Sequence, residues 1–174
     1  HGRKKRRALN RMRAAVVLIA LLLLPALADC PVGTEIFFCP AGKKVIQVCL
    51  QGTTVTYRYG TVARPDLSLT VPLQDADYVP WNGIGRTMWD SLAFHNKGYS
   101  YEVWAATDKM MDEADPPSVL QGGVNVMKGD KLQAQVTCDK GRVSSTLDLL
   151  YERKTAIGQC WNYTSNAWQP APCP

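Results

Sequence analysis

Apolar and polar residues alternate along short stretches of this chain, as they do in β-strands that bury one face. The clearest case is residues 53–59, where Val55, Tyr57 and Tyr59 share one face and polar side chains occupy the other. Residues 99–105 repeat the same period of two. Both stretches are therefore predicted to be half-buried strands.

Turn signals separate these stretches and predict hairpins, because glycine, proline and asparagine favour the backbone angles of tight turns. A further short strand over residues 67–71 is stopped by Pro72. The three hairpins are predicted for residues 34–39 with 44–50 around Pro40-Ala41-Gly42-Lys43, residues 88–95 with 99–105 around Asn96-Lys97-Gly98, and residues 119–127 with 131–138 around Lys128-Gly129-Asp130.

Residues 145–154 (STLDLLYERK) fit two structures. They contain strong helix formers, an acidic residue near the start and basic residues near the end, which suits a helix. Leu147, Leu149 and Tyr151 also alternate with other residues, which suits a strand. A strand is the prediction for this segment, with a helix as the alternative.

Residues 12–28 have the layout of a secretory signal peptide. A short basic start precedes an apolar run over residues 14–24, and a proline and small residues follow. Cleavage is expected between Ala28 and Asp29. The apolar run is about half of the roughly 20 residues that a spanning helix needs. No other stretch of the chain is apolar for long enough, so no membrane span is expected in the mature chain.

The chain is therefore predicted to divide into a leader and one domain. Residues 1–28 form the signal peptide, of which residues 1–11 are interpreted as upstream sequence or an extended n-region. Residues 29–174 form a single β-rich domain with a disulfide-closed C-terminal tail, in the periplasm or secreted. Its fold is predicted to be all-β with little helix, an antiparallel β-sandwich or barrel stapled by disulfides.

The leader also decides how the charge is interpreted. The whole chain carries a net charge of +5, with 20 basic and 15 acidic residues. Seven of the basic residues and none of the acidic ones precede the cleavage site, so the mature chain has a net charge of −2. A nucleic-acid partner is therefore not expected.

The six cysteines predict three structural disulfides behind a signal peptide. If Cys39 lies opposite Lys44 in the first hairpin, then Thr34 lies opposite Cys49, and the segment before it folds back onto that end. The last two cysteines bracket the aromatic tail, and one long pair remains by elimination. The predicted bridges are Cys30–Cys49, Cys160–Cys173 and Cys39–Cys138.

Few residues suit catalysis. His95 is the only histidine of the predicted mature chain, and it sits at a predicted strand end beside a turn, so we interpret it as a surface or capping imidazole. The chain has no G-x-S-x-G, P-loop or G-x-G-x-x-G motif, and Gly83-Ile84-Gly85 is interpreted as a turn. We expect no catalytic residue, no cofactor and no enzymatic activity.

The densest group of carboxylates lies in one polar segment, residues 108–117. Met110 and Met111 stand where an EF-hand needs ligands and glycine, and no C-x-x-C pair suggests another metal site. A solvated loop without metal is the prediction, and a weak calcium site is the alternative. The acidic residues are Asp108, Asp112, Glu113 and Asp115.

Aromatic residues are the strongest candidates for binding, because tryptophan and tyrosine provide large contact areas for sugars and proteins. Most of them are expected in the core of a β-domain. Four fall in predicted loops, so these are expected at the surface as binding residues: Tyr78, Trp81, Trp161 and Trp168.

One set of motifs carries a resemblance to known proteins. It consists of Phe38-Cys39, residues 42–49 (GKKVIQVC), residues 57–60 (YRYG) and residues 98–103 (GYSYEV). The set resembles a group of small uncharacterised secreted or periplasmic proteins of Gram-negative bacteria, with the pattern F-x-C…GKKxIxVC…YRYG. That group has no assigned activity, so the resemblance implies only the compartment and the fold class.

Two functions remain open from the sequence. The first is a non-enzymatic binding protein that acts on a protein partner in the cell envelope, like a periplasmic lysozyme inhibitor by fold analogy only. The second is a glycan-binding or weakly hydrolytic domain that acts on the cell wall. Exposed, coplanar tryptophans favour the glycan, whereas buried tryptophans with a loop that inserts into a partner favour the protein.

Overall fold

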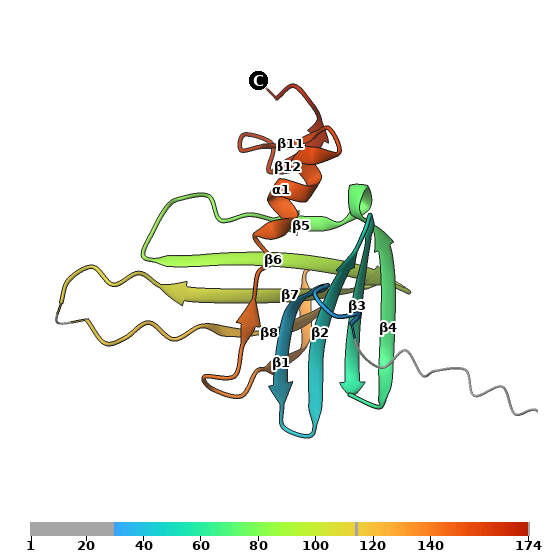
Figure 1. Cartoon of the computed structure of the whole chain (residues 1–174), viewed down its shortest axis with the longest axis vertical. Coiled ribbons are helices and arrows are strands. Elements are labelled where there is room, and N and C mark those ends of the chain that lie inside the picture. Colours follow the sequence, from blue (N-terminus) through green and yellow to red (C-terminus); the bar gives the residue numbers. More distant parts are fainter. Residues whose placement is uncertain (1–29, 114, 174) are drawn as a thin grey trace, which may run out of the picture.

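The computed structural model describes residues 30–113 and 115–173. The predicted signal peptide and its cleavage site lie outside the described residues. The described part is mostly β, with two five-stranded antiparallel sheets, a separate hairpin and one short helix (Figure 1). This architecture confirms the predicted fold class.

The first sheet has the strand order β10–β1–β2–β3–β4. Two-residue turns join β1 to β2, β2 to β3 and β3 to β4, so the sheet is a meander with one added edge strand. On β3 the predicted alternation is present, because Val55 and Tyr57 are fully buried while Thr54 is exposed. The bounds are β1 Glu35–Ala41, β2 Lys44–Gln51, β3 Thr54–Thr61, β4 Arg64–Pro72 and β10 Ser144–Ser145.

The second sheet has the order β5–β6–β7–β8–β9 and contains the other two predicted hairpins. The β6–β7 turn is Lys97-Gly98, and both residues have positive φ (50° and 79°), as a tight hairpin turn of this kind requires. The bounds are β5 Asp77–Val79, β6 Thr87–Asn96, β7 Tyr99–Asp108, β8 Gln121–Lys128 and β9 Lys131–Thr137.

The two sheets face each other across one core, and their strands cross steeply in Figure 1. The rings of Tyr57 on β3 and Phe94 on β6 stack with centroids 5.4 Å apart, which joins the two sheets at the centre. No strand pairing closes the sheets into a barrel among the described residues, so the arrangement is a sandwich. The core also contains Phe37, Val48, Leu92, Val103 and Val124.

The predicted strand over residues 145–154 is wrong. The strand β10 stops at Ser145, and the chain continues into helix α1, which spans Leu149–Ala156. Leu147, Leu150 and Lys154 are buried at spacings of three and four residues, which is the period of a helix. Tertiary burial of this stripe therefore outweighs the local alternation of apolar residues.

A buried lysine fixes α1 to the sandwich. The fully buried ammonium of Lys154 donates to the carbonyl oxygens of Leu73 (3.0 Å), Gln74 (3.1 Å) and Ala76 (2.9 Å). These residues belong to or directly follow a single 3₁₀ turn, η1 (Leu73–Asp75), which leads from the first sheet to the second. The helix is thereby held at the point where the chain changes sheets.

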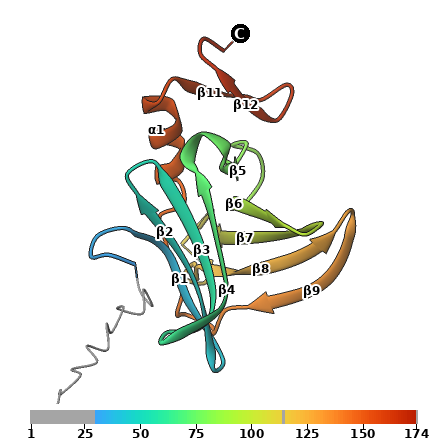
Figure 2. The ribbon, with the colours of Figure 1, turned by 90° about the vertical axis from the view of Figure 1, so that its right-hand side faces the viewer.

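The last hairpin packs on α1, at one end of the sandwich (Figure 2). It consists of β11 (Gln159–Asn162) and β12 (Ala167–Pro170). Trp161 and Trp168 pair across its strands, with ring centroids 5.7 Å apart. Trp168 also meets the ring of Tyr151 on α1 edge-on at 5.4 Å. The aromatic tail is therefore a packed structural unit.

All six cysteines are paired, and the three predicted bridges are confirmed. Three structural disulfides are typical of proteins that fold in an oxidising compartment outside the cytoplasm. They are Cys30–Cys49, Cys39–Cys138 and Cys160–Cys173.

The register of the first hairpin differs from the prediction, which placed Cys39 opposite Lys44. Cys39 lies opposite Ile46 instead, because β1 continues further and the chain reverses within two residues rather than four. A β-bulge in β1 then shifts the pairing by one residue near Cys49. The bridge from Cys49 to Cys30 forms all the same.

Candidate binding cleft

A cleft of about 500 Å³ opens on the inner face of the second sheet. Asp90 and Met88 on β6 line it, and they continue the face on which Leu92 and Phe94 are buried in the core. Its other walls come from the loop after β5, from Ser145, from α1 and from the turn of the last hairpin. The cleft is thus an open continuation of the core.

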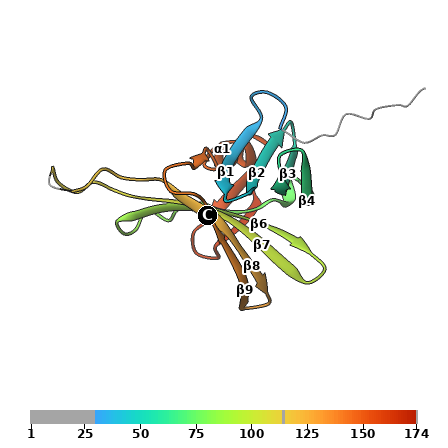
Figure 3. The same cartoon turned by 90° about the horizontal axis from the view of Figure 1, so that it is seen from below.

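One side of the cleft is formed by β6 and β7, a two-stranded ribbon that extends beyond the other strands of its sheet. The pairing of β5 with β6 ends at Ser91 and that of β8 with β7 ends at Ala106, whereas β6 and β7 stay paired as far as Thr87 and Asp108. We call the free end of this ribbon, with residues 80–86 and 109–111 that continue it, the arm. It projects from the sandwich in Figures 1 and 3.

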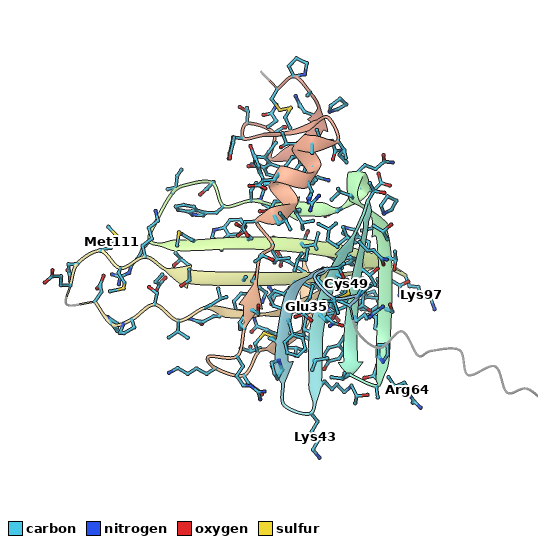
Figure 4. The ribbon with its side chains drawn as sticks, in the orientation of Figure 1. Glu35, Lys43, Cys49, Arg64, Lys97 and Met111 are labelled. Carbon is cyan, nitrogen blue, oxygen red and sulfur yellow. A yellow bond between two sulfur atoms is a disulfide. The ribbon has the colours of Figure 1, made fainter. Side chains whose placement is uncertain are left out.

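The arm exposes large apolar side chains. Ile84, Met110 and Met111 have exposed fractions of 76%, 56% and 67%. Figure 4 shows Met111 at the far end of the arm, away from both sheets. Exposed apolar groups of this size, gathered on a projecting segment, are typical of a contact surface.

Local hydrogen bonds shape the first segment of the arm. Gly83 and Gly85 take positive φ (81° and 93°), and Ile84 protrudes between them. The indole Nε1 of Trp81 donates to the carbonyl of Ile84 at 3.1 Å, and Oδ1 of Asn82 accepts from the Ile84 N–H at 3.0 Å. Trp81 is thereby held as a wall of the cleft.

One carboxylate that lines the cleft is held by a partly buried hydrogen bond. The hydroxyl of Tyr78 donates to Oδ1 of Asp90 at 2.6 Å, and the backbone N–H of Trp81 also donates to this carboxylate. Burial raises the pKa of Asp90, and the charge of Asp148 raises it further, while the two hydrogen bonds act in the opposite direction. Burial likewise raises the pKa of Tyr78.

The opposite wall carries a second carboxylate and two tyrosines. Asp148 is the N-cap residue of α1, but its side chain makes no capping hydrogen bond, and it lines the cleft. Tyr151 on α1 and Tyr163 in the turn of the last hairpin stand beside it. The cleft therefore combines aromatic surface with negative charge from two sides.

The predicted binding residues separate into two groups. Tyr78 and Trp81 line the cleft, whereas Trp161 and Trp168 do not. The expected surface exposure is wrong for Tyr78 (1% exposed) and Trp161 (6%), because both lie in strands and face packed neighbours. Trp168 supports the cleft from behind, since its Nε1 donates to the carbonyl of Tyr78 at 2.6 Å.

Sequence reasoning missed the two carboxylates of the cleft. For Asp90 a signal exists, since it shares the core-facing alternation of β6 with Leu92 and Phe94, where a charged residue is unusual. For Asp148 the acidic residue near the helix start was noted, but only the fold shows that it faces a cleft. Tyr151 and Tyr163 carry no local signal of their position.

The remaining polar candidates lie elsewhere. Nε2 of His95 on β6 is 3.0 Å from Oδ2 of Asp77 on the neighbouring strand β5, and both side chains are exposed. In the acidic segment, Asp115 accepts from the backbone N–H of Met111 and pairs with Arg86 at 3.0 Å, and these contacts lower the pKa of Asp115. No group of three or more potential metal-binding side chains occurs within residues 30–113 and 115–173.

Comparisons with known proteins add no relative. No family model, no curated protein and no solved structure matches the chain, so the resemblance to secreted Gram-negative proteins stays a prediction. In the part of the chain that the structure describes, no helix is long and apolar enough to cross a membrane.

Replacing Asp90 by asparagine is expected to leave the domain as stable or to stabilise it by about 1 kcal/mol at pH 7. The amide oxygen still accepts from Tyr78, while the buried charge is gone. Because the pKa of Asp90 is raised in the folded state, ionisation costs stability as the pH rises through that range. The difference in the free energy of unfolding between Asp90→Asn and the parent should therefore vanish below about pH 4.

Urea unfolding of the parent and Asp90→Asn between pH 3 and pH 8 measures this effect. Asp130→Asn, in the exposed β8–β9 turn, is the matched control. A clear loss of stability in Asp90→Asn at pH 7 that Asp130→Asn does not share would contradict the expectation.

Proposed function

We propose that this domain is a non-enzymatic binding protein of the bacterial envelope, periplasmic or secreted, that holds a protein partner at the arm and the cleft beside it. The observation that carries the proposal is the arm itself, a ribbon that projects beyond both neighbouring strands and exposes Ile84, Met110 and Met111. The three disulfides and the predicted leader support the location.

The two tryptophans of the last hairpin favour a protein over a glycan. Trp161 is buried, and its ring is inclined by 61° to that of Trp168, so the two offer no coplanar platform. Trp168 is held by its hydrogen bond to Tyr78. Flat, exposed tryptophan pairs are what a sugar-binding surface needs, and the last hairpin presents none.

The test combines variants of the arm with recovery of the partner. The exported protein is used to capture binders from periplasm and culture medium, and the recovered protein is purified and titrated by calorimetry. Ile84→Ser with Met111→Ser is expected to weaken binding about tenfold or more, because each side chain loses its buried apolar contact. Leu132→Ser is the control, since Leu132 is also a largely exposed apolar residue (56%) but lies on β9, outside the arm.

A captured protein that binds the arm variant as tightly as the parent would contradict this proposal. So would the absence of any saturable partner.

The second candidate is a glycan-binding or weakly hydrolytic domain, and one observation favours it. Asp90 and Asp148 line the same cleft, and burial raises the pKa of Asp90, as in the acid of many glycoside hydrolases. Purified protein assayed on peptidoglycan decides between the candidates. Turnover that is lost in both Asp90→Asn and Asp148→Asn would replace the binding proposal with this one.

A further inference from the structure

The side chains that line the cleft offer aromatic surface and negative charge without a basic partner. Tyr78, Trp81, Tyr151 and Tyr163 contribute rings, and none of the described lining residues is lysine, arginine or histidine. Such a combination is what recognition sites for organic cations share, because carboxylates and ring faces both attract positive charge.

The carboxylate of Asp90 is held in place without a counter-charge. Its hydrogen-bond donors are the hydroxyl of Tyr78 and the backbone N–H of Trp81, both neutral. The only charged group that shifts its pKa is Asp148, which has the same sign. A partly buried charge that faces only neutral donors and a like charge gains when a cation enters.

Four other aspartates of the described residues have basic partners within 4.0 Å. Neither Asp90 nor Asp148 forms an ion pair with a described residue. The paired aspartates are Asp66 with Lys44, Asp77 with His95, Asp115 with Arg86 and Asp139 with Arg142.

The wall of the cleft already holds one cation on an aromatic face. The ammonium of Lys109, on the arm, lies 4.0 Å from the centroid of the Trp81 ring. Lys109 is not among the residues that line the cleft, so it leaves the space between Asp90 and Asp148 free. The Trp81 ring is thus placed to attract positive charge.

We infer that the cleft receives a cationic side chain, lysine or arginine, that the protein partner presents next to the surface covered by the arm. This inference rests on the proposed function and names the chemistry of the partner. A volume of about 500 Å³ accommodates either side chain with its neighbouring backbone. The apolar arm supplies contact area, and the charged cleft selects a basic residue.

The test uses blocked tripeptides as probes of the full exported protein, Ac-Gly-Lys-Gly-NH₂ and Ac-Gly-Arg-Gly-NH₂. Their neutral counterparts carry norleucine and citrulline in the central position. The readout is the indole N–H resonance of Trp81 in a ¹⁵N-labelled sample, assigned with Trp81→Phe. Saturable shifts are expected with lysine or arginine, at affinities about tenfold or more above the neutral counterparts.

Three variants locate the site. Asp90→Asn and Asp148→Asn are each expected to weaken binding of the cationic probe about tenfold, while Asp130→Asn leaves it unchanged. Asp90→Asn keeps the acceptor for Tyr78, and unaltered amide spectra show that each variant is folded.

Equal binding of the neutral probes, an equal loss in Asp130→Asn, or no saturable shift with either cationic probe would overturn the inference. The result of the probe titration does not depend on the side chains of the arm, so it can be separated from the test of the proposed function. If partner capture depends on Ile84 and Met111 but the cationic probes fail, only the inference falls. If the probes bind but capture ignores the arm, the proposed docking of a protein falls instead.

Discussion

Replacing Cys39 and Cys138 together by alanine is expected to lower the free energy of unfolding by about 4–5 kcal/mol. The bridge joins β1 of the first sheet to the end of β9 in the second, across a sequence separation of 99 residues. Removing it restores the chain entropy of a very long loop to the unfolded state. Both cysteines are buried, so the loss of packing adds to the effect.

Guanidinium unfolding of the protein with its disulfides formed measures this loss. Cys160→Ala with Cys173→Ala is the comparison, because that bridge closes a separation of only 13 residues and is expected to cost about 3 kcal/mol or less. If the short bridge cost more than the long one, the loop-entropy explanation would be wrong for this domain.

Replacing Lys154 by methionine is expected to lower the free energy of unfolding by about 3 kcal/mol. The change keeps the aliphatic length but removes the ammonium that donates to the carbonyls of Leu73, Gln74 and Ala76. Those carbonyls lie where the chain passes between the sheets, so α1 and η1 should loosen together. Glu152→Gln, exposed on the same helix, is the control.

The pH dependence of stability distinguishes Lys154 from an ordinary packing residue. Burial lowers the pKa of Lys154 to about 8, and Asp75 and Asp77 oppose this only in part. Between about pH 8 and pH 10 the unfolded state then binds more protons, so the free energy of unfolding rises with pH. Above pH 10 the raised pKa of buried Tyr57 and Tyr78 reverses the slope.

This rise should be absent in Lys154→Met and present in Glu152→Gln. Urea unfolding at intervals between pH 7 and pH 10 records it. A parent protein whose stability stays flat or falls over that range would contradict the explanation from burial.

The strands and bridges were predictable because their signals are local. Val55 and Tyr57 alternate with polar residues, and Lys97-Gly98 adopts the backbone of a tight turn, so hairpins follow from neighbouring residues alone. The Cys30–Cys49 bridge then follows from the end of the first hairpin, the last two cysteines bracket the tail, and Cys39–Cys138 remains by elimination. The predicted bridges are correct although the predicted partner of Cys39 in the hairpin is wrong by two residues. The opposing strand ends lie close together in either register.

Helix α1 and the cleft depend on contacts far apart in the sequence. Lys154 is buried only because η1, some eighty positions earlier, presents carbonyls to it. Asp90 and Asp148 line one cleft only because the fold brings the start of α1 and the free end of β6 to the same place. Local composition selected Tyr78 and Trp81, which line the cleft, but the same rule also selected Trp161, which the hairpin buries.

The longest bridge has a consequence for survival in a compartment that contains proteases. Every residue of the arm lies between Cys39 and Cys138 in the sequence. An exposed segment such as Met110–Met111 is where a protease would first cut. A single cut there leaves two fragments that the Cys39–Cys138 bridge still joins covalently. The strands of each sheet then remain close enough to stay paired. The cleaved protein therefore stays one covalent molecule unless the disulfide is reduced.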